Sequence, residues 1–236
     1  MNKQVLMKLE EVKKTYVMGE VTVEALKEST VDIYQGELLV ILGPSGSGKS
    51  TLLNLIGGMD KPTTGKIIFK EKDLSKVKDK ELTFYRRQDV GFVFQFYNLI
   101  SDLTAHENVD LAAELVRDPL PVDEVLQVVG LFDRKDHFPA QMSGGEQQRV
   151  SIARAIVKQP LLLLCDEPTG ALDYKTGILV LGLLGEISRQ RGTTVVIVTH
   201  NTAIAAMADR VMRMRSGEIV EINHNPNPLP SERIEW

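Results

Sequence analysis

Four short runs of aliphatic and β-branched residues occur along the chain without alternating polar positions. They cover residues 37–42, 89–94, 160–165 and 193–199, and each stands just before residues that carry catalytic or ligand-binding groups. An unbroken apolar run of this length is typical of a strand covered on both faces, as in a parallel sheet between helices. The runs therefore predict four strands of a buried, mostly parallel sheet.

Helical patterns separate these runs. Residues 47–58 begin in a glycine-rich turn and continue as a helix, and residues 174–191 form a longer helical run that stops before Gly192. A glycine directly after such a run is a common C-terminal stop, because it adopts the left-handed backbone conformation without strain. Strands that alternate with helices predict an α/β fold class.

The opening third of the chain has a different period. In residues 5–16, 29–34 and 65–70 apolar and polar side chains alternate. A period of two favours strands with one polar face, as in an antiparallel sheet. We therefore expect an N-terminal antiparallel β subdomain beside a mostly parallel sheet core that is flanked by helices.

Two later segments stand apart from this core. Residues 104–139 have a helical pattern interrupted at Pro119 and Pro121, which predicts a small helical subdomain. Residues 223–236 contain three prolines and no packing periodicity, so we expect an extended surface arm. For Trp236, the sole tryptophan, docking onto the domain or a partner and a disordered terminus both stay open.

Composition narrows the class of protein. The 236 residues suffice for one domain or a tight pair of subdomains, and 43% hydrophobic and 25% charged residues are ordinary for a globular chain. Disordered and fibrous classes are therefore excluded. The 32 acidic residues exceed the 28 basic ones and give a net charge of −4, so a general nucleic-acid binder is not expected.

The lone cysteine and the apolar runs bear on the compartment. Cys165 by itself excludes an intrachain disulfide and a multi-cysteine zinc site, and it fits a reducing compartment. The chain does not start with the apolar segment of a secretory signal. Its longest apolar run, residues 177–185, is far shorter than the roughly 20 residues that cross a bilayer. We expect a cytoplasmic protein whose membrane-spanning helices, if it works at a membrane, belong to another polypeptide.

The segment GPSGSGKST matches the phosphate-binding loop G-x-x-x-x-G-K-[ST] and follows a predicted strand. Backbone N–H groups of such a loop and the N-terminus of the helix that follows bind the β-phosphate of a nucleotide. Lys49 is expected to bridge β and γ oxygens, and the Ser50 hydroxyl to ligate Mg²⁺. The candidate ATP-binding residues of this loop are Gly43, Pro44, Ser45, Gly46, Ser47, Gly48, Lys49, Ser50 and Thr51.

Asp166 and Glu167 end the apolar run LLLLCDEP. At the carboxyl end of a strand Asp166 can hold Mg²⁺ through water, and the adjacent Glu167 can polarise the water that attacks a γ-phosphate. For an acidic pair alone, a solvated turn would be the simpler interpretation. Beside an independent phosphate loop, the pair is interpreted as a metal ligand and a general base.

A third motif, MSGGEQQRVSIARA, covers residues 142–155. By itself SGG predicts only a helix start with Ser143 as N-cap. Together with the upstream phosphate loop and the downstream CDEP, it resembles the signature sequence of ATP-binding cassette (ABC) ATPases, and the resemblance spans nearly the whole chain. It implies a P-loop NTPase fold of the ABC ATPase type.

The resemblance also implies an assembly. In ABC proteins the signature element faces the γ-phosphate bound by the opposite subunit, so a head-to-tail homodimer with two ATP molecules at its interface is expected. The signature residues that would act on the partner subunit's ATP are Ser143, Gly144, Gly145 and Glu146.

Other family positions are carried over singly as implications of the resemblance. Tyr16 matches the aromatic residue that stacks on adenine, although an ordinary half-buried tyrosine at a strand end stays open. Gln95 matches the Q-loop glutamine, which reaches Mg²⁺ or water, and His200 matches the switch histidine that contacts the γ-phosphate and orients Glu167. The D-loop, which crosses the dimer interface, matches Gly170, Ala171, Leu172 and Asp173.

Catalytic and metal-binding roles are expected for some of these residues. Catalysis is assigned to Glu167, His200 and Gln95. The metal ligands are expected to be Ser50, Gln95 and Asp166, with Mg²⁺ as cofactor and ATP as substrate. The predicted organisation is one ABC ATPase domain and a tail, with the nucleotide-binding core at 1–95 and 159–222, the helical subdomain with the signature at 96–158, and the proline-rich tail at 223–236.

Residues 25–67, 92–109 and 167–177 carry a finer resemblance. They look like the ATPase subunits of the lipoprotein-release and macrolide-export branch, the LolD/MacB type, which is also similar to the cell-division cassette FtsE. This resemblance implies a separate membrane permease, MacB- or FtsX-like, that contacts the region 96–116, and a peripheral position on the inner face of the cell membrane. Three departures stand out: Met142 replaces a common leucine, Tyr174 follows the D-loop where a small residue is usual, and the arm before the signature is short.

Two alternatives to a transporter subunit remain. An FtsE-like regulator of cell division or the cell wall would have a partner that moves no solute, and its cassette would look the same. A soluble ABC regulator, such as a DNA-repair or ribosome-associated ATPase, usually carries two cassettes or a long coiled-coil insertion. This chain has neither.

Overall fold

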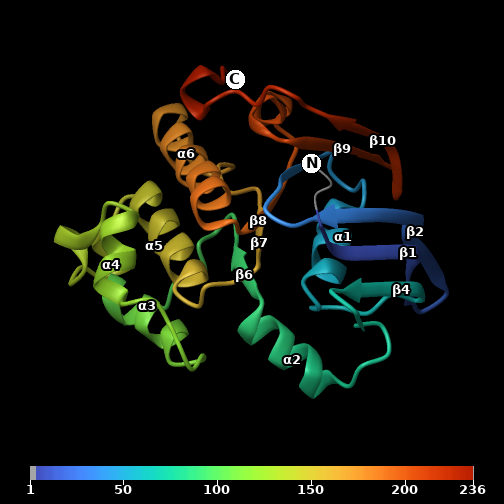
Figure 1. Ribbon diagram of the computed structural model, residues 1–236, viewed down its shortest axis with the longest axis horizontal. Helices are drawn as coiled ribbons and strands as arrows, with labels where there is room; N and C mark the ends of the chain where they lie inside the picture. The colour runs from blue at the N-terminus through green and yellow to red at the C-terminus, as the bar shows by residue number, and fades with distance from the viewer. Residues whose placement is uncertain (1–3, 236) are drawn as a thin grey trace.

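A computed structural model describes residues 4–235, and its strands form two sheets (Figure 1). The six-stranded sheet has the order β10-β9-β3-β8-β7-β6. Its strands are β3 (Leu38–Leu42), β6 (Val90–Val93), β7 (Leu162–Asp166), β8 (Thr194–Thr199), β9 (Arg210–Arg215) and β10 (Glu218–His224). The pairs β3–β8, β8–β7, β7–β6 and β3–β9 are parallel, and only β10 pairs antiparallel, with β9. The predicted α/β fold with a mostly parallel sheet is confirmed.

Both faces of this sheet are covered, as the unbroken apolar runs predict. In β3 every residue is buried. Val40 belongs to a core cluster on one face, whereas Leu39 and Ile41 belong to the cluster on the other. This happens because successive side chains of a strand point to opposite faces, so a strand between two layers needs apolar residues at every position.

The smaller sheet is antiparallel and has the order β2-β1-β4-β5. Its strands are β1 (Val5–Met18), β2 (Val21–Tyr34), β4 (Thr64–Phe69) and β5 (Lys72–Asp73). Met7 and Leu9 on β1 and Ile33 on β2 are fully buried. The residue between Met7 and Leu9 and the two neighbours of Ile33 along β2 are partly exposed. The predicted antiparallel β subdomain is confirmed, and β2 begins at Val21 rather than near Ser29.

Six α-helices complete the described chain. They are α1 (Lys49–Ile56), α2 (Asp79–Gln88), α3 (Ala105–Ala113), α4 (Val122–Val128), α5 (Gly144–Ile156) and α6 (Tyr174–Arg191). In Figure 1 α3, α4 and α5 gather at one end of the molecule, away from β1, β2 and β4. Helix α6 spans the predicted residues, because Asp173 caps its first turn and Gly192 ends it at φ 67°. The sequence analysis missed α2, β9 and β10.

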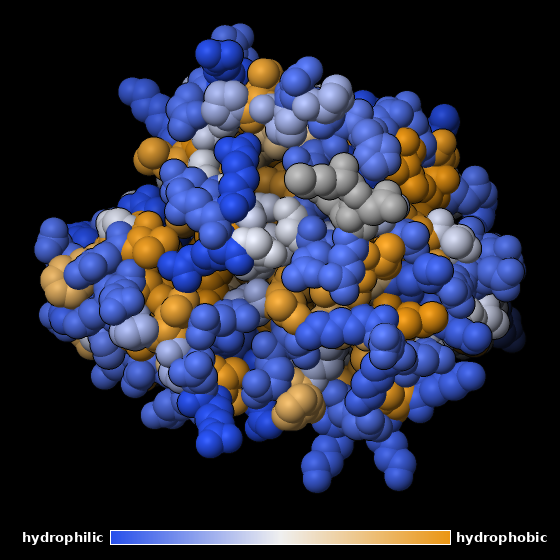
Figure 2. Space-filling model, in the orientation of Figure 1, coloured by the Kyte–Doolittle hydropathy of each residue, from blue (hydrophilic) through white to orange (hydrophobic). Residues whose placement is uncertain are grey.

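Short 3₁₀ turns fill the remaining connections: η1 (Phe132–Arg134), η2 (Pro139–Gln141), η3 (Thr202–Met207) and η4 (Ser231–Arg233). Over residues 4–235 we find no helix that has both the length and the apolar character to cross a membrane. The face in Figure 2 is mostly hydrophilic, with hydrophobic residues in small groups between hydrophilic ones.

The C-terminal tail differs from the predicted surface arm. Ile234 is 2% exposed and belongs to the same core cluster as Val180 and Leu184 of α6. The expectation of an arm without packing is therefore wrong for this residue. A single apolar residue has no periodicity to detect, so the sequence pattern did not reveal it. Trp236, for which docking and disorder were left open, lies outside the described residues.

A buried ion pair joins the two sheets where β2 meets β3 and β9. Arg210 and Glu37 have side chains 4% and 2% exposed, and Arg210 Nη2 lies 3.1 Å from Glu37 Oε1. Arg210 also donates to the carbonyl of Asp32 and lies 4.7 Å from the centre of the Tyr34 ring. Glu37 in turn accepts from the backbone N–H of Tyr34 at 2.8 Å. Each buried charge therefore has more than one partner, as burial requires, while Arg210 Nε is buried without a hydrogen-bond partner among the described residues.

We expect Arg210→Ala to lower the free energy of unfolding by about 3–5 kcal/mol, because it leaves Glu37 buried without its cation. Urea unfolding measures this loss. The double variant Glu37→Gln/Arg210→Met is expected to regain most of it. Lys27→Ala, which breaks an exposed ion pair with Glu218, is the control and should change stability far less. If Arg210→Ala and Lys27→Ala lowered the free energy of unfolding equally, the role of the buried pair would be contradicted.

Candidate functional site

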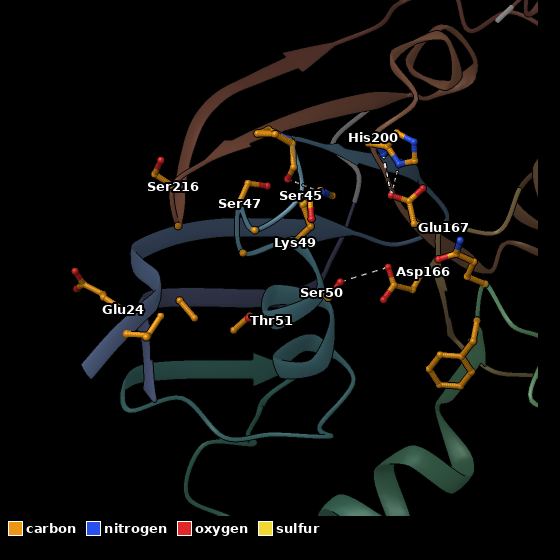
Figure 3. Close-up of a pocket in the computed structure, with 18 of the residues that line it drawn as sticks. Glu24, Ser45, Ser47, Lys49, Ser50, Thr51, Asp166, Glu167, His200 and Ser216 are labelled. Atoms are coloured by element: carbon orange, nitrogen blue, oxygen red, sulfur yellow. Dashed lines mark hydrogen bonds and ion pairs between the residues drawn. The ribbon is translucent and has the colours of Figure 1, made fainter. Parts of the chain in front are cut away.

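A cavity of about 1280 Å³ opens at the carboxyl edge of the six-stranded sheet (Figure 3). Residues at or after the carboxyl ends of β3, β7 and β8 line it, among them Lys49, Asp166 and His200. In open α/β sheets ligands bind at this edge, because the loops after parallel strands converge there. The cavity exceeds the size of a typical small-molecule pocket, so a ligand as large as a nucleotide has room in it.

The predicted phosphate loop forms one wall of the cavity. Gly48 has φ 94° and is the N-cap of α1. A methyl group in place of its hydrogen would come within 2.5 Å of the carbonyl oxygen of Ala25, and one at Gly43 within 2.4 Å of that of Met214. Glycine is therefore required at both positions, by the left-handed backbone at Gly48 and by close backbone contacts at both.

Lys49 turns back onto this loop. Its ammonium donates to the carbonyls of Gly43 at 2.8 Å and Pro44 at 2.9 Å, and the residue is only 7% exposed. Helix α1 has no acidic residue in its first turn. A buried cation and a helix N-terminus therefore face the same cavity, and both favour a negatively charged ligand such as a phosphate.

Ser50 and Asp166 meet across the cavity. The Ser50 hydroxyl lies 3.5 Å from Asp166 Oδ1. Burial raises the pKa of the Asp166 carboxyl, and the neighbouring charge of Glu167 raises it further, while the Ser50 hydroxyl and the charge of Lys49 lower it less. Gln95 lines the same cavity. Hydroxyl, carboxylate and amide oxygens are the ligands that Mg²⁺ takes, so the three predicted metal ligands are brought together.

Glu167 is held by three donors. Its carboxylate accepts from the Thr199 hydroxyl at 2.9 Å and from the backbone N–H of His200 at 3.0 Å. His200 Nδ1 lies 2.8 Å from the same carboxylate (Figure 3). The backbone of Glu167 has φ 48°, and its N–H donates to the carbonyl of Val198. A non-glycine residue in this conformation at a cavity wall indicates that the position of the carboxylate is fixed by its surroundings.

The signature motif begins α5 with a capping box. The Ser143 hydroxyl accepts from the N–H of Glu146, and the Glu146 carboxylate accepts from the Ser143 N–H at 2.8 Å and hydroxyl at 2.9 Å. Arg134 donates to the other oxygen of Glu146 at 3.1 Å. Burial raises the pKa of Glu146, but the hydrogen bonds from Ser143 and the charge of Arg134 outweigh it and the net pKa is lowered. In this structure the Glu146 side chain thus serves the helix start.

The two signature glycines lie against other predicted loops. A methyl group at Gly145 would come within 2.0 Å of Thr176 Cγ2, and one at Gly144 within 2.7 Å of the Tyr97 hydroxyl. Thr176 belongs to the first turn of α6, and Tyr97 follows Gln95. The start of α5 is therefore in contact with both the D-loop side and the Q-loop side of the molecule.

The D-loop leads directly into α6. The Asp173 carboxylate caps that helix, accepting from the Thr176 N–H at 3.2 Å and hydroxyl at 2.6 Å, and the Thr176 hydrogen bonds lower the pKa of Asp173. A methyl group at Gly170 would lie 3.0 Å from Gln95 Nε2, so the D-loop adjoins the Q-loop. Leu172 is partly buried against the core, and Ala171 is exposed.

Several predicted residues do not line the cavity, among them Gly43 and the D-loop residues. Tyr16 lies outside its lining; the Tyr16 hydroxyl donates to Asp60 Oδ2 at 2.8 Å, and Lys14 Nζ lies 4.8 Å from the centre of its ring. The signature residues Ser143, Gly144 and Gly145 are also absent from the lining. One copy of the described chain therefore does not bring its own signature to its own phosphate loop.

Some lining residues were missed by the sequence analysis. Those from the antiparallel sheet and the β9–β10 turn are Val23, Glu24, Ala25, Ser216 and Gly217, and those beside Gln95 are Phe94, Phe96 and Asn98. The Gly217 N–H donates to the Ser47 carbonyl at 3.1 Å, which ties the turn to the phosphate loop. The Ser-Gly pair between two apolar segments is a turn signal that predicts the β9–β10 hairpin, but not its place against the loop.

Comparison with known proteins gives one consistent result. A family model described as ABC transporter matches residues 26–170. The MG065 homolog of Mycoplasma pneumoniae, whose name describes an ABC transporter ATP-binding protein, is 44% identical over 98% of this chain and 50% of its own length. The macrolide export ATP-binding/permease protein MacB of Escherichia coli K12 is 44% identical over 97% of this chain and 35% of its own length. The chain thus spans half or less of these two curated relatives.

A solved structure agrees with both sequence comparisons. The dimeric structure of a post-hydrolysis state of the ATP-binding cassette MJ0796, bound to ADP and Pi, superposes with a TM-score of 0.85 at 43% sequence identity. The match covers 92% of this chain and 98% of that chain. The similarity therefore extends over nearly the whole length of one chain of a dimeric cassette.

We expect Asp166→Asn to raise the melting temperature of the nucleotide-free protein at pH 7. The folded protein ionises this carboxyl at a higher pH than the unfolded chain, so ionisation destabilises the fold once the pH exceeds the unfolded value. The amide removes that cost, and the gain should shrink as the pH is lowered toward the raised pKa. Scanning calorimetry measures it, with the exposed Asp133→Asn as control. A lower melting temperature for Asp166→Asn would contradict a destabilising charge.

Proposed function

The chain belongs to the ATP-binding family of ABC transporters, and from that premise we propose that it is the ATP-hydrolysing subunit of a MacB/LolD-type complex. One observation carries the proposal. Lys49, Asp166, Glu167 and His200 come from three separate segments of the chain and line a single cavity. Those side chains supply a phosphate-binding cation, a metal-binding carboxylate and a held general base.

The phosphate loop and Lys49 bind the triphosphate. Lys49 exchanges its two carbonyl partners for oxygens of the β- and γ-phosphates, and backbone N–H groups at the start of α1 add further donors. A lysine already confined to the loop loses little side-chain entropy on binding, so it is ready for the anion.

Glu167 acts as the general base. A water oxygen attacks the γ-phosphorus while the bond to the β–γ bridging oxygen breaks, ADP leaves, and the water proton passes to the Glu167 carboxylate. Thr199 and His200 hold that carboxylate at 2.9 Å and 2.8 Å, so its orientation is set before water arrives. Positioning and charge stabilisation dominate such a transfer because the protein makes no covalent bond to phosphate.

The acceptor oxygens near the loop fit a magnesium ion. Ser50, Asp166 and Gln95 would hold it, and the raised pKa of Asp166 agrees with a carboxylate placed where a cation belongs. When bound, Mg²⁺ supplies positive charge to the β- and γ-phosphate oxygens. The charge of Lys49 lowers this pKa, but the pKa remains raised overall. The protein's own groups therefore compensate the negative charge of Asp166 only in part.

We infer a head-to-tail homodimer with ATP between the copies. The signature residues Ser143, Gly144 and Gly145 lie outside the cavity of their own chain but begin a helix of 13 residues, whose N-terminus favours an anion. A second copy can present this helix start to the γ-phosphate. The dimeric structure of MJ0796 supports this arrangement.

A membrane permease, MacB- or FtsX-like, is the proposed partner, which would place the protein on the cytoplasmic face of the membrane. The region 96–116 offers it a surface with exposed apolar side chains, of which Phe96 is 75%, Leu111 45% and Leu115 51% exposed. Large apolar side chains left exposed are frequent in interaction sites. An FtsE-like regulator with a non-transporting partner would use the same surface, so it stays the second candidate.

We expect Glu167→Gln to bind ATP and dimerise but to hydrolyse ATP at least about a hundredfold more slowly, because the amide cannot accept the proton of water. Phosphate release measures turnover, and size-exclusion chromatography with ATP measures the dimer. Glu186→Gln makes the same chemical change at an exposed position of α6 and is the control. Undiminished turnover in Glu167→Gln would overturn the assignment of the base.

The permease is expected to co-purify with the chain from membranes. Mass spectrometry identifies it: a permease with an extracytoplasmic domain supports the proposal, whereas ribosomes or DNA would support a soluble regulator. Leu115→Asp should lower the yield of the partner, because it places a charge on the proposed surface. Leu179→Asp, at a position of α6 that is 62% exposed, is the matched control and should retain the partner.

A further inference from the structure

The C-terminal segment lies across two elements that follow the catalytic loops. At its start, Asn225 donates through its side chain to the carbonyl of Ala206 at 3.1 Å and through its backbone N–H to that of Asp209 at 2.8 Å. The Leu229 N–H also donates to the Ala206 carbonyl, at 2.8 Å. Ala206 belongs to η3, which begins two residues after His200. In Figure 1 this segment continues beside α6.

The segment then packs tightly on α6. Ser231 is 5% and Ile234 is 2% exposed. A methyl group at Gly182 of α6 would lie 2.9 Å from the Ser231 hydroxyl, so the helix has a glycine where the tail crosses it. An apolar residue buried to this degree contributes as a core residue does, and this holds the segment in place.

The last described contact reaches the D-loop. The Tyr174 hydroxyl donates to the carbonyl of Ile234 at 2.8 Å. Tyr174 is the first residue of α6 and directly follows Asp173, which caps that helix through Thr176. Thr176 in turn lies against the signature glycine Gly145. The hydrogen bond from Tyr174 thus joins Ile234 to the turn that supports both the D-loop and the signature motif.

We propose that residues 225–235 form a strap that positions the D-loop and the His200 loop, with Tyr174 and Ile234 as its positioning residues. The inference rests on the proposed ATPase function, because these loops matter only for that reaction. The strap spans from η3, after His200, to the start of α6, after Asp173. Fixing both ends on one packed segment reduces the number of backbone conformations that the two loops adopt before ATP binds.

Tyr174→Phe tests this, since it removes only the hydroxyl that binds Ile234. We expect kcat to fall about two- to tenfold, the range that corresponds to one hydrogen bond, while KM for ATP stays unchanged because the phosphate loop is untouched. Amide hydrogen exchange of the nucleotide-free protein is the second measurement. Residues 170–177 should exchange faster in Tyr174→Phe than in the wild type.

Two exposed neighbours are the matched controls. Lys175→Ala changes the next residue of α6 and Glu232→Ala changes the tail between its two buried residues. Both should leave kcat and exchange as in the wild type. Ile234→Ala should act in the same direction as Tyr174→Phe and should also speed exchange in residues 200–207, at the other end of the strap.

Either of two results would overturn the strap: exchange in residues 170–177 unchanged by Tyr174→Phe, or a lower melting temperature for that variant with unchanged kcat. The second result would mean that the bond stabilises the fold without positioning the loops. Failure of the proposed function is distinguishable, because it would appear as a wild-type protein without ATPase activity. The exchange measurement would still decide on the strap in that case.

Discussion

The parallel register of β3, β8 and β7 is the constraint on which the rest of the site depends. Leu42 at the end of β3 pairs with Thr199 at the end of β8, and Asp166 at the end of β7 pairs with Val198. Residues after these strands therefore emerge at one edge, where Lys49, Glu167 and His200 share a cavity. A shift of one residue in either pairing would turn the strand side chains, Asp166 among them, to the opposite face of the sheet and displace the residues that follow.

The site is held at some cost to the fold. Glu167 has a left-handed backbone, Asp166 is an ionisable group whose burial raises its pKa, and Lys49 is almost fully buried. The apolar clusters on both faces of the six-stranded sheet offset this cost in free energy, and the Arg210–Glu37 pair joins the two sheets. Groups in strained or desolvated positions beside a cavity are typical of a site organised before its ligand arrives.

The geometry also agrees with the proposed homodimer. The start of α5 contacts Tyr97 on the Q-loop side and Thr176 at the start of α6. A ligand bound at the N-terminus of α5 would therefore affect the positions of both residues. Yet the signature lies outside the cavity of its own chain. ATP bound between two copies would therefore link the phosphate loop of one copy with the signature motif, Q-loop and D-loop of the other. The strap, which binds Tyr174 through Ile234, adds a further constraint on the turn between the D-loop and α6.

The sequence by itself determined the local features: the four parallel strands of the predicted core, the phosphate loop, the cap at Ser143, and the catalytic and phosphate-binding residues that gather at the cavity. These follow from short-range chemistry, since an apolar run, a glycine pattern or a capping residue acts within a few positions. Only the tertiary structure decided that Arg134 binds Glu146, that Tyr16 binds Asp60, and that Ile234 is buried on α6. Those contacts join residues whose pairing depends on the packed fold, and no local pattern encodes them.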